Sequence, residues 1–118
     1  MNEKSDLIWY GGRLFRAVKN SSNGQISSET IFRYKQKGDV LTGDYSGGDI
    51  EYGQIIGLVD DRGHINFRYQ HLTYDGYLMT GRCKSRPEIM ENGKIRLHER
   101  WQWTCSDRSK GTSVLEEV

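Results

Sequence analysis

Short turns rich in glycine, asparagine and aspartate interrupt this chain at regular intervals. The runs between them have the length of ordinary β-strands and are rich in β-branched and aromatic residues, which is the pattern of successive β-hairpins. No segment keeps a helical period over three turns. The pattern therefore predicts an all-β chain, with turns at Asn23-Gly24, Lys37-Gly38-Asp39, Gly47-Gly48-Asp49, Asp61-Arg62-Gly63, Asp75-Gly76 and Asn92-Gly93.

Eight or nine such strands follow one another, joined by turns that suit antiparallel neighbours. Closing them into an up-and-down barrel removes the two unpaired edges of an open sheet. The sequence predicts this antiparallel meander barrel, lipocalin-like or avidin-like, as one domain over residues 1–118 with a polar tail at 1–6. An open two-sheet sandwich ranks second. The predicted strands are Leu7–Tyr10, Leu14–Lys19, Thr30–Lys37, Val40–Ser46, Ile50–Asp60, His64–Leu72, Tyr77–Ser85, Ile95–Cys105 and, with a weaker pattern, Ser113–Glu117.

Two hairpins predict a register by their hydrophobic pattern. A two-residue turn in the first puts Tyr34 opposite Gly43. A four-residue loop at 60–63 in the second puts Leu58 opposite Ile65. Both pairings gather apolar side chains onto one face of the sheet, so each supports the other.

Two later turns predict less regular connections. The turn at Asp75-Gly76 keeps its strands in phase if it is a three-residue loop with a bulge. A loop over 86–94 would bring Cys83 near Leu97 and leave Cys105 far along the same strand. We therefore predict that the two cysteines are not joined.

The stretch LHERWQW, residues 97–103, places a carboxylate on an aromatic face. Alternation along a strand puts Glu99 on the same side as Leu97, Trp101 and Trp103. The whole predicted inner face is aromatic and unusually polar for a plain core. It comprises Phe32, Tyr34, Tyr45, Gln54, Ile56, Leu58, Ile65, Phe67, Tyr69, His71, Met79, Cys83, Leu97, Glu99, Trp101 and Trp103.

A buried carboxylate needs hydrogen-bond donors, and this requirement gives Glu99 three alternative roles. It accepts hydrogen bonds and fixes the register, or it forms the polar end of a ligand pocket, or it lies in water at a barrel mouth. The donors predicted for it are Tyr34, Tyr69, His71 and Trp101. Apolar walls with a few convergent polar groups are typical of small-molecule sites. The candidate pocket is Tyr34, Tyr45, Tyr69, His71, Glu99, Trp101 and Trp103.

Composition narrows the remaining classes. A net charge of +1 argues against a broad surface for nucleic acid or an anionic membrane. Two cysteines in strand-like runs and a polar start indicate reduced thiols and a cytoplasmic protein, although a secreted chain without its signal would look the same. Histidine spacing predicts no metal site, and no motif indicates a cofactor or an oligomeric state. The outward row of Arg68, Arg96, His98 and Arg100 is a solvated face or an anion-binding strip.

Three stretches carry a resemblance that covers roughly residues 9–118. They are ETIFRYKQKGDVLTGDYSGGDIEYGQIIG, YQH followed by TGRCKSRPE, and GKIRLHERWQW followed by SVLEEV. In these stretches the chain is similar to a family of small bacterial proteins, some of which bear the name N-acetylglutamate synthase. The resemblance implies amino-acid N-acetyltransferase activity for such members and supplies no catalytic residues. The predicted architecture resembles avidin-like and lipocalin-like barrels, an analogy that does not transfer a ligand.

The residues argue against acetyltransferase chemistry. Acyl-CoA enzymes of the common fold place a Q/R-x-x-G-x-G/A turn before a helix whose N-terminal amides bind the pyrophosphate. The nearest match is QIIGLV, in which Val59 stands where glycine or alanine is required and a turn into another strand follows. We predict that acetyl-CoA does not bind.

Two main function classes therefore stay open, together with a third possibility that needs no interior site. The first is a non-enzymatic binder of a small molecule inside the barrel, which we favour. The second is an enzyme, either an acetyltransferase or a barrel that uses Glu99 and His71 as acid and base. The third is a barrel filled by its own side chains that acts through a protein partner.

Overall fold

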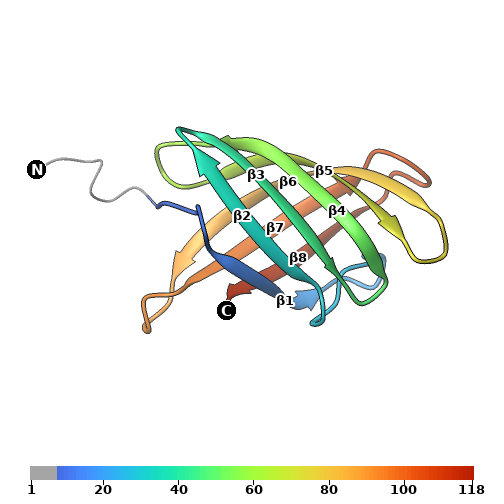
Figure 1. Ribbon diagram of the computed structural model, residues 1–118, viewed down its shortest axis with the longest axis horizontal. Coiled ribbons are helices and arrows are strands. Elements are labelled where there is room, and N and C mark those ends of the chain that lie inside the picture. The colour runs from blue at the N-terminus through green and yellow to red at the C-terminus, as the bar shows by residue number, and fades with distance from the viewer. Residues whose placement is uncertain (1–7) are drawn as a thin grey trace, which may run out of the picture.

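Eight antiparallel strands in sequence order form a closed barrel in the computed structural model, which describes residues 8–118 (Figure 1). The last strand pairs with the first and leaves no sheet edge, which confirms the predicted meander barrel. The strands are β1 Leu14–Asn20, β2 Ile31–Lys37, β3 Val40–Gly47, β4 Ile50–Val59, β5 Ile65–Thr73, β6 Leu78–Ile89, β7 Ile95–Trp103 and β8 Lys110–Glu117.

The predicted strand at Leu7–Tyr10 is wrong in its described part. Ile8 to Tyr10 form no strand, and Leu7 lies outside the described residues. Instead, this segment leads across one end of the barrel. Within residues 8–118 there is no helix long and apolar enough to cross a membrane.

Every second side chain along a strand points into the barrel and fills its interior, as β7 shows most clearly. Leu97, Glu99, Trp101 and Trp103 are all buried, whereas Arg100 is exposed. The inward direction predicted for Glu99 is therefore confirmed. Glycine makes room for the largest rings, because a Cβ atom at Gly81 would overlap the ring of Tyr69 across the strand pair.

The predicted register is right between β2 and β3 and wrong between β4 and β5. Tyr34 pairs with Gly43 as expected, but Ile65 pairs with Val59 and not with Leu58. The loop has three residues, because the amide of Asp60 donates to the carbonyl of His64.

The cause is local turn chemistry at this loop. The carboxylate of Asp60 accepts hydrogen bonds from the amides of Arg62 and His64, both at 2.9 Å, and Gly63 adopts a φ of 78°. A register shift of one residue moves every side chain of β4 to the opposite face of the sheet. Three residues predicted inside therefore face outward, namely Gln54, Ile56 and Leu58, and the latter two are 62% and 58% exposed.

The two later connections have opposite outcomes. The three-residue loop at Tyr74–Gly76 is confirmed by the bond from the Thr73 amide to the Tyr77 carbonyl. The loop predicted over 86–94 is wrong, because β6 continues through Pro87 and the turn comes at 91–93.

This longer β6 changes the partners of β7. Ser85 pairs with Glu99, and Cys83 pairs with Trp101 where Leu97 was predicted. Both cysteines are nonetheless free, as predicted.

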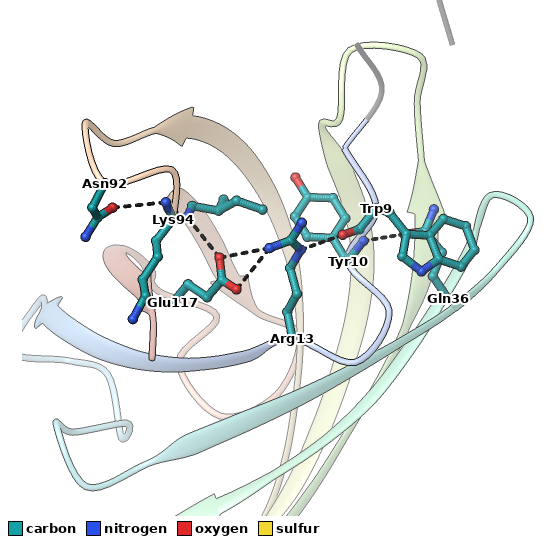
Figure 2. Close-up of polar contacts among 8 residues, drawn as sticks. Trp9, Tyr10, Arg13, Gln36, Asn92, Lys94 and Glu117 are labelled. Atoms are coloured by element: carbon teal, nitrogen blue, oxygen red, sulfur yellow. Dashed lines mark hydrogen bonds and ion pairs between the residues drawn. The ribbon is translucent and has the colours of Figure 1, made fainter. Parts of the chain in front are cut away.

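One end of the barrel, here called the Tyr10 end, is closed by the N-terminal segment (Figure 1). Tyr10 is fully buried there, and its hydroxyl donates to the carbonyl of Gly63. Figure 2 shows the polar contacts around it: Arg13 lies between the Trp9 carbonyl and the carboxylate of Glu117, which it meets at 3.0 and 3.1 Å. The Tyr10 amide donates to the side chain of Gln36 at 2.8 Å.

Candidate functional site

The opposite end, here called the Gln25 end, is covered by the loop between β1 and β2, residues 21–30. The Gln25 side chain enters the barrel, and its Oε1 lies 2.6 Å from Nε2 of His71. The indole nitrogen of Trp103 donates to the Asn23 carbonyl at 3.1 Å. The loop is thus held to the interior by polar contacts to two inner-face rings.

A layer of aromatic rings lies directly beneath this loop. The ring centroid of Trp103 is 5.4 Å from Trp101, 5.7 Å from His71 and 5.8 Å from Tyr69. Tyr45 approaches His71 edge-on at 5.6 Å. Five of the seven predicted pocket residues therefore meet here, contributed by β3, β5 and β7.

His71 is a neutral hydrogen-bond relay between the wall and the loop. Burial lowers the pKa of its imidazole to about 4. The Oε1 of Gln25 can only accept, so Nε2 of His71 carries the proton. Nδ1 then accepts a hydrogen bond from the hydroxyl of Tyr45 at 2.7 Å.

Glu99 lies deeper and has one hydrogen-bond partner within residues 8–118. The hydroxyl of Ser85 donates to its Oε2 at 3.0 Å. Burial raises the pKa of the Glu99 carboxyl from 4.5 to about 7, and the Ser85 hydrogen bond opposes this rise. Glu99 is only 6% exposed, so it does not lie in water at a barrel mouth.

The donors predicted for Glu99 are wrong. Trp101 donates its indole N–H to Ser113 at 2.8 Å, and Ser113 in turn donates to Asn20 at 2.6 Å. Ser85 is the donor because of the β6–β7 register, in which it stands opposite Glu99.

Tyr34 is the predicted pocket residue that lies apart. It packs against Tyr10 and Phe15, at ring-centroid distances of 6.2 and 4.9 Å, toward the Tyr10 end. Its buried hydroxyl has no hydrogen-bond partner within residues 8–118. Burial, and then the charge of Glu99, raise the pKa of this hydroxyl well above its ordinary value.

Between the aromatic layer and Glu99 lies a cavity of about 40 Å³. This volume has room for a few water molecules. It is far smaller than the roughly 300 Å³ at which ligand pockets begin. Its walls come from the loop and from the strands, and include Gln25, Ile26, Phe32, Tyr45, Ile55, Phe67, Tyr69, Cys83, Glu99, Trp101, Trp103 and Ser113.

A second hollow, of about 840 Å³, lies along β4 to β8 and is lined by charges of both signs, among them Asp60, Lys84 and Arg100. Its lining also includes Ser85 and Glu99, so the buried carboxylate borders this hollow as well as the cavity beneath the loop. In the outward row, Arg96 is paired with Glu116 and His98 with Glu88, at 2.7 Å each. The Arg96–Glu116 pair offsets part of the positive charge of the strip, so the cavity lined by the predicted pocket residues is the better candidate site.

Sequence reasoning missed the polar residues that complete the cavity. Ser113 lies on the inner face of β8 by simple alternation and was open to prediction. Ser85 required the correct β6–β7 register. Gln25 lies in a loop without periodicity, and no sequence signal marks it as inward-pointing.

Comparison with known proteins agrees with this architecture. The family model described as avidin-like protein matches residues 8–118. No curated protein and no solved structure matches the chain. The match spans nearly the whole sequence, and the chain belongs to the avidin-like protein family.

Proposed function

We propose that this protein binds a small molecule inside the barrel, at the Gln25 end. The observation that carries the proposal is the roof of the cavity, which is a loop and not a strand. Beneath that roof, aromatic walls surround a few polar groups, as in small-molecule sites generally. Membership of the avidin-like family is consistent with a ligand in the barrel interior.

The small volume of the cavity requires the loop to move before a ligand enters. A space of about 40 Å³ holds water but no larger molecule, so Gln25 and Ile26 must leave the interior. Their departure breaks the bond to His71, the bond from Asn20 to the Ile26 carbonyl and the bond from Trp103 to the loop, but no rung of the barrel ladder. The apparent affinity is reduced by the fraction of molecules with the loop open.

Binding is favoured over catalysis by the hydrogen-bond partners of the two candidate acid–base groups. His71 is engaged by Tyr45 and Gln25, and Glu99 by Ser85, so the two share no hydrogen bond. The stretch that resembles an acyl-CoA turn, Gln54–Val59, lies within β4 and leads through a turn into β5.

A specific observation supports the protein-partner alternative. Val40 and Leu58 are paired across β3 and β4, and with Ile56 they expose apolar side chains on the outer wall. A barrel that acts through such a surface has no need of an interior ligand.

The test is a thermal-shift screen of small molecules, followed by calorimetry of the hits. A ligand that binds only the folded state raises the melting temperature with its concentration. We expect Trp103→Leu to weaken binding at least about tenfold, because it removes part of the pocket wall. Trp9→Phe, at a residue 51% exposed at the Tyr10 end, is the matched control and should leave binding unchanged.

The Trp9→Phe variant also gives a direct signal, because its remaining tryptophans are Trp101 and Trp103. Interior binding should change its fluorescence. Hits that respond to Ile56→Ala and not to Trp103→Leu would favour the outer surface and contradict the proposal.

A further inference from the structure

In the described part of the chain, the ionisable side chains buried in the barrel interior include an acid but no lysine or arginine. Among residues 8–118, no lysine or arginine is buried, and Glu99 is the one buried carboxylate. Carboxylates are seldom buried without a cation or several donors, since desolvation of the charge is costly. Glu99 has one donor, Ser85, and within this part of the chain its Oε1 has no hydrogen-bond partner.

The titratable groups that share the barrel interior with Glu99 supply no positive charge. They are Tyr34 on β2, Tyr45 on β3, Tyr69 and His71 on β5, Cys83 on β6, and Tyr10 before β1. Burial raises the pKa of the tyrosine hydroxyls and of the Cys83 thiol, and it lowers the pKa of His71. All of them are therefore neutral at pH 7.

The two indole donors of the cavity wall are already used, whereas the carboxylate of Glu99 keeps acceptor capacity. The indole N–H of Trp101 is bound to Ser113, and that of Trp103 to the Asn23 carbonyl. Nearby, Trp103 meets Trp101 and Tyr69 in two edge-to-face pairs, with ring centroids 5.4 and 5.8 Å apart. A carboxylate and aromatic rings both attract a cation, and aromatic rings hold substituted ammonium groups particularly well.

We propose that the ligand of this barrel is a small organic cation, an amine or substituted ammonium whose charged group lies beside Glu99 within the walls of Trp101, Trp103 and Tyr69. The inference rests on the proposed function and names its ligand class. A metal ion does not fit, because within residues 8–118 no three acidic, histidine or cysteine side chains cluster to hold one. An anion would meet Glu99 with no cation to offset it.

Cation binding must be linked to the titration of Glu99. The bound state requires the carboxylate, and the pKa of the free carboxyl is raised to about 7 by burial. Below that pH, ligand binding releases a proton, so affinity should rise toward about tenfold per pH unit. Above it, affinity should level off until the amine itself loses its proton.

The experiment compares three probes of similar shape: benzylamine, benzyl alcohol and benzoate. Each is titrated into the full-length protein while the three indole N–H signals are followed by nuclear magnetic resonance. We expect benzylamine to shift the signals of Trp101 and Trp103 and to leave that of Trp9 in place. It should bind at least about tenfold more tightly than benzyl alcohol, as one charge-assisted contact implies, and benzoate should not bind.

Two variants separate the charge of Glu99 from the shape of the pocket. Glu99→Gln should bring benzylamine down to the affinity of benzyl alcohol. Glu88→Gln removes a carboxylate from the outer face, where Glu88 pairs with Arg96 and His98, and should keep the preference. If Glu99→Gln fails to fold, the wild-type protein still tests the proposal. Its affinity for benzylamine should increase between pH 6 and 7, whereas its affinity for benzyl alcohol should not.

The cation proposal is overturned if benzylamine fails to bind, if benzyl alcohol binds equally well, or if the preference survives Glu99→Gln. Neutral or anionic hits in the thermal-shift screen would likewise overturn it and leave the proposed function standing. The proposed function itself fails if no molecule of any charge binds inside the barrel.

Discussion

The two ends of the barrel are closed by different means. At the Tyr10 end, a buried aromatic ring fills the opening and packs against Phe15 and Tyr34. At the Gln25 end, a polar loop covers the opening and leaves a cavity of about 40 Å³ below it. A fully buried aromatic ring closes the first end, whereas loop hydrogen bonds, among them those to His71 and Trp103, and the partly buried Ile26 close the second. Because each such bond contributes only about 1 kcal/mol net, we expect the second end to open more readily.

The largest effect should come from removing the ring at the Tyr10 end. Tyr10→Ala deletes a fully buried aromatic side chain and the hydroxyl that bonds Gly63, so we expect a loss of about 3–5 kcal/mol in the free energy of unfolding. Urea denaturation measures it. Tyr74→Ala, at a residue 68% exposed, is the control and should cost little. A small loss for Tyr10→Ala would mean that this end is not a structural plug.

The next effect concerns the buried charge beneath the Gln25 end. The folded state keeps the proton of Glu99 up to about pH 7, whereas the unfolded chain releases it near 4.5. The contribution of Glu99 to wild-type stability should therefore fall as pH rises from 4.5 to 7, by about 3 kcal/mol in all. Glu99→Gln removes this dependence and should be more stable than wild type at pH 8, with little difference at pH 4. If the unfolding free energies of the two proteins varied with pH in parallel, the raised pKa of a buried Glu99 would be contradicted.

Two glutamines allow the ends to be compared with the same substitution. Gln25 bonds His71 at one end, and Gln36 accepts the Tyr10 amide at the other. We expect Gln25→Ala and Gln36→Ala each to cost about 1 kcal/mol. Only the former should speed hydrogen exchange of the Trp103 indole, because only it loosens the loop over that ring. Equal exchange in both variants would remove the distinction between the ends.

The smallest expected effect is none. Within residues 8–118, the stretch that most resembles a phosphate-binding turn for acetyl-CoA ends at Val59 in β4 and is followed by a turn into β5. Calorimetry should detect no binding. Micromolar affinity would contradict this and favour the acetyltransferase alternative.

The general fold was open to prediction because turn chemistry and strand alternation agree along the whole chain. The same rules placed Glu99, Trp101 and Trp103 inside, where the structure has them. These rules failed at the turn between β4 and β5, which the sequence allows to be a three-residue or a four-residue loop. The Asp60 carboxylate selects a three-residue loop, and this single shift turns Ile56 and Leu58 outward.

The candidate site was less predictable than the fold. Five of its rings follow from alternation, but the partner of Glu99 depends on how far β6 extends past Pro87. The insertion of Gln25 depends on tertiary contacts of a loop, which no periodic pattern records. The sequence therefore predicts the walls of the cavity and not its roof.

The central claim is that the Gln25 end opens while the Tyr10 end stays closed. Residue-resolved native-state hydrogen exchange tests it most directly. At the Gln25 end, the amides of Gly24 and Thr30 bond within the loop. At the Tyr10 end, the amides of Gly12 and Tyr34 bond between the N-terminal segment and β2.

We predict that the loop amides exchange by local opening, at least about a hundredfold faster than the amides of the plug, which should exchange only with global unfolding. Equal protection at both ends, or faster exchange at Gly12 and Tyr34, would contradict the account.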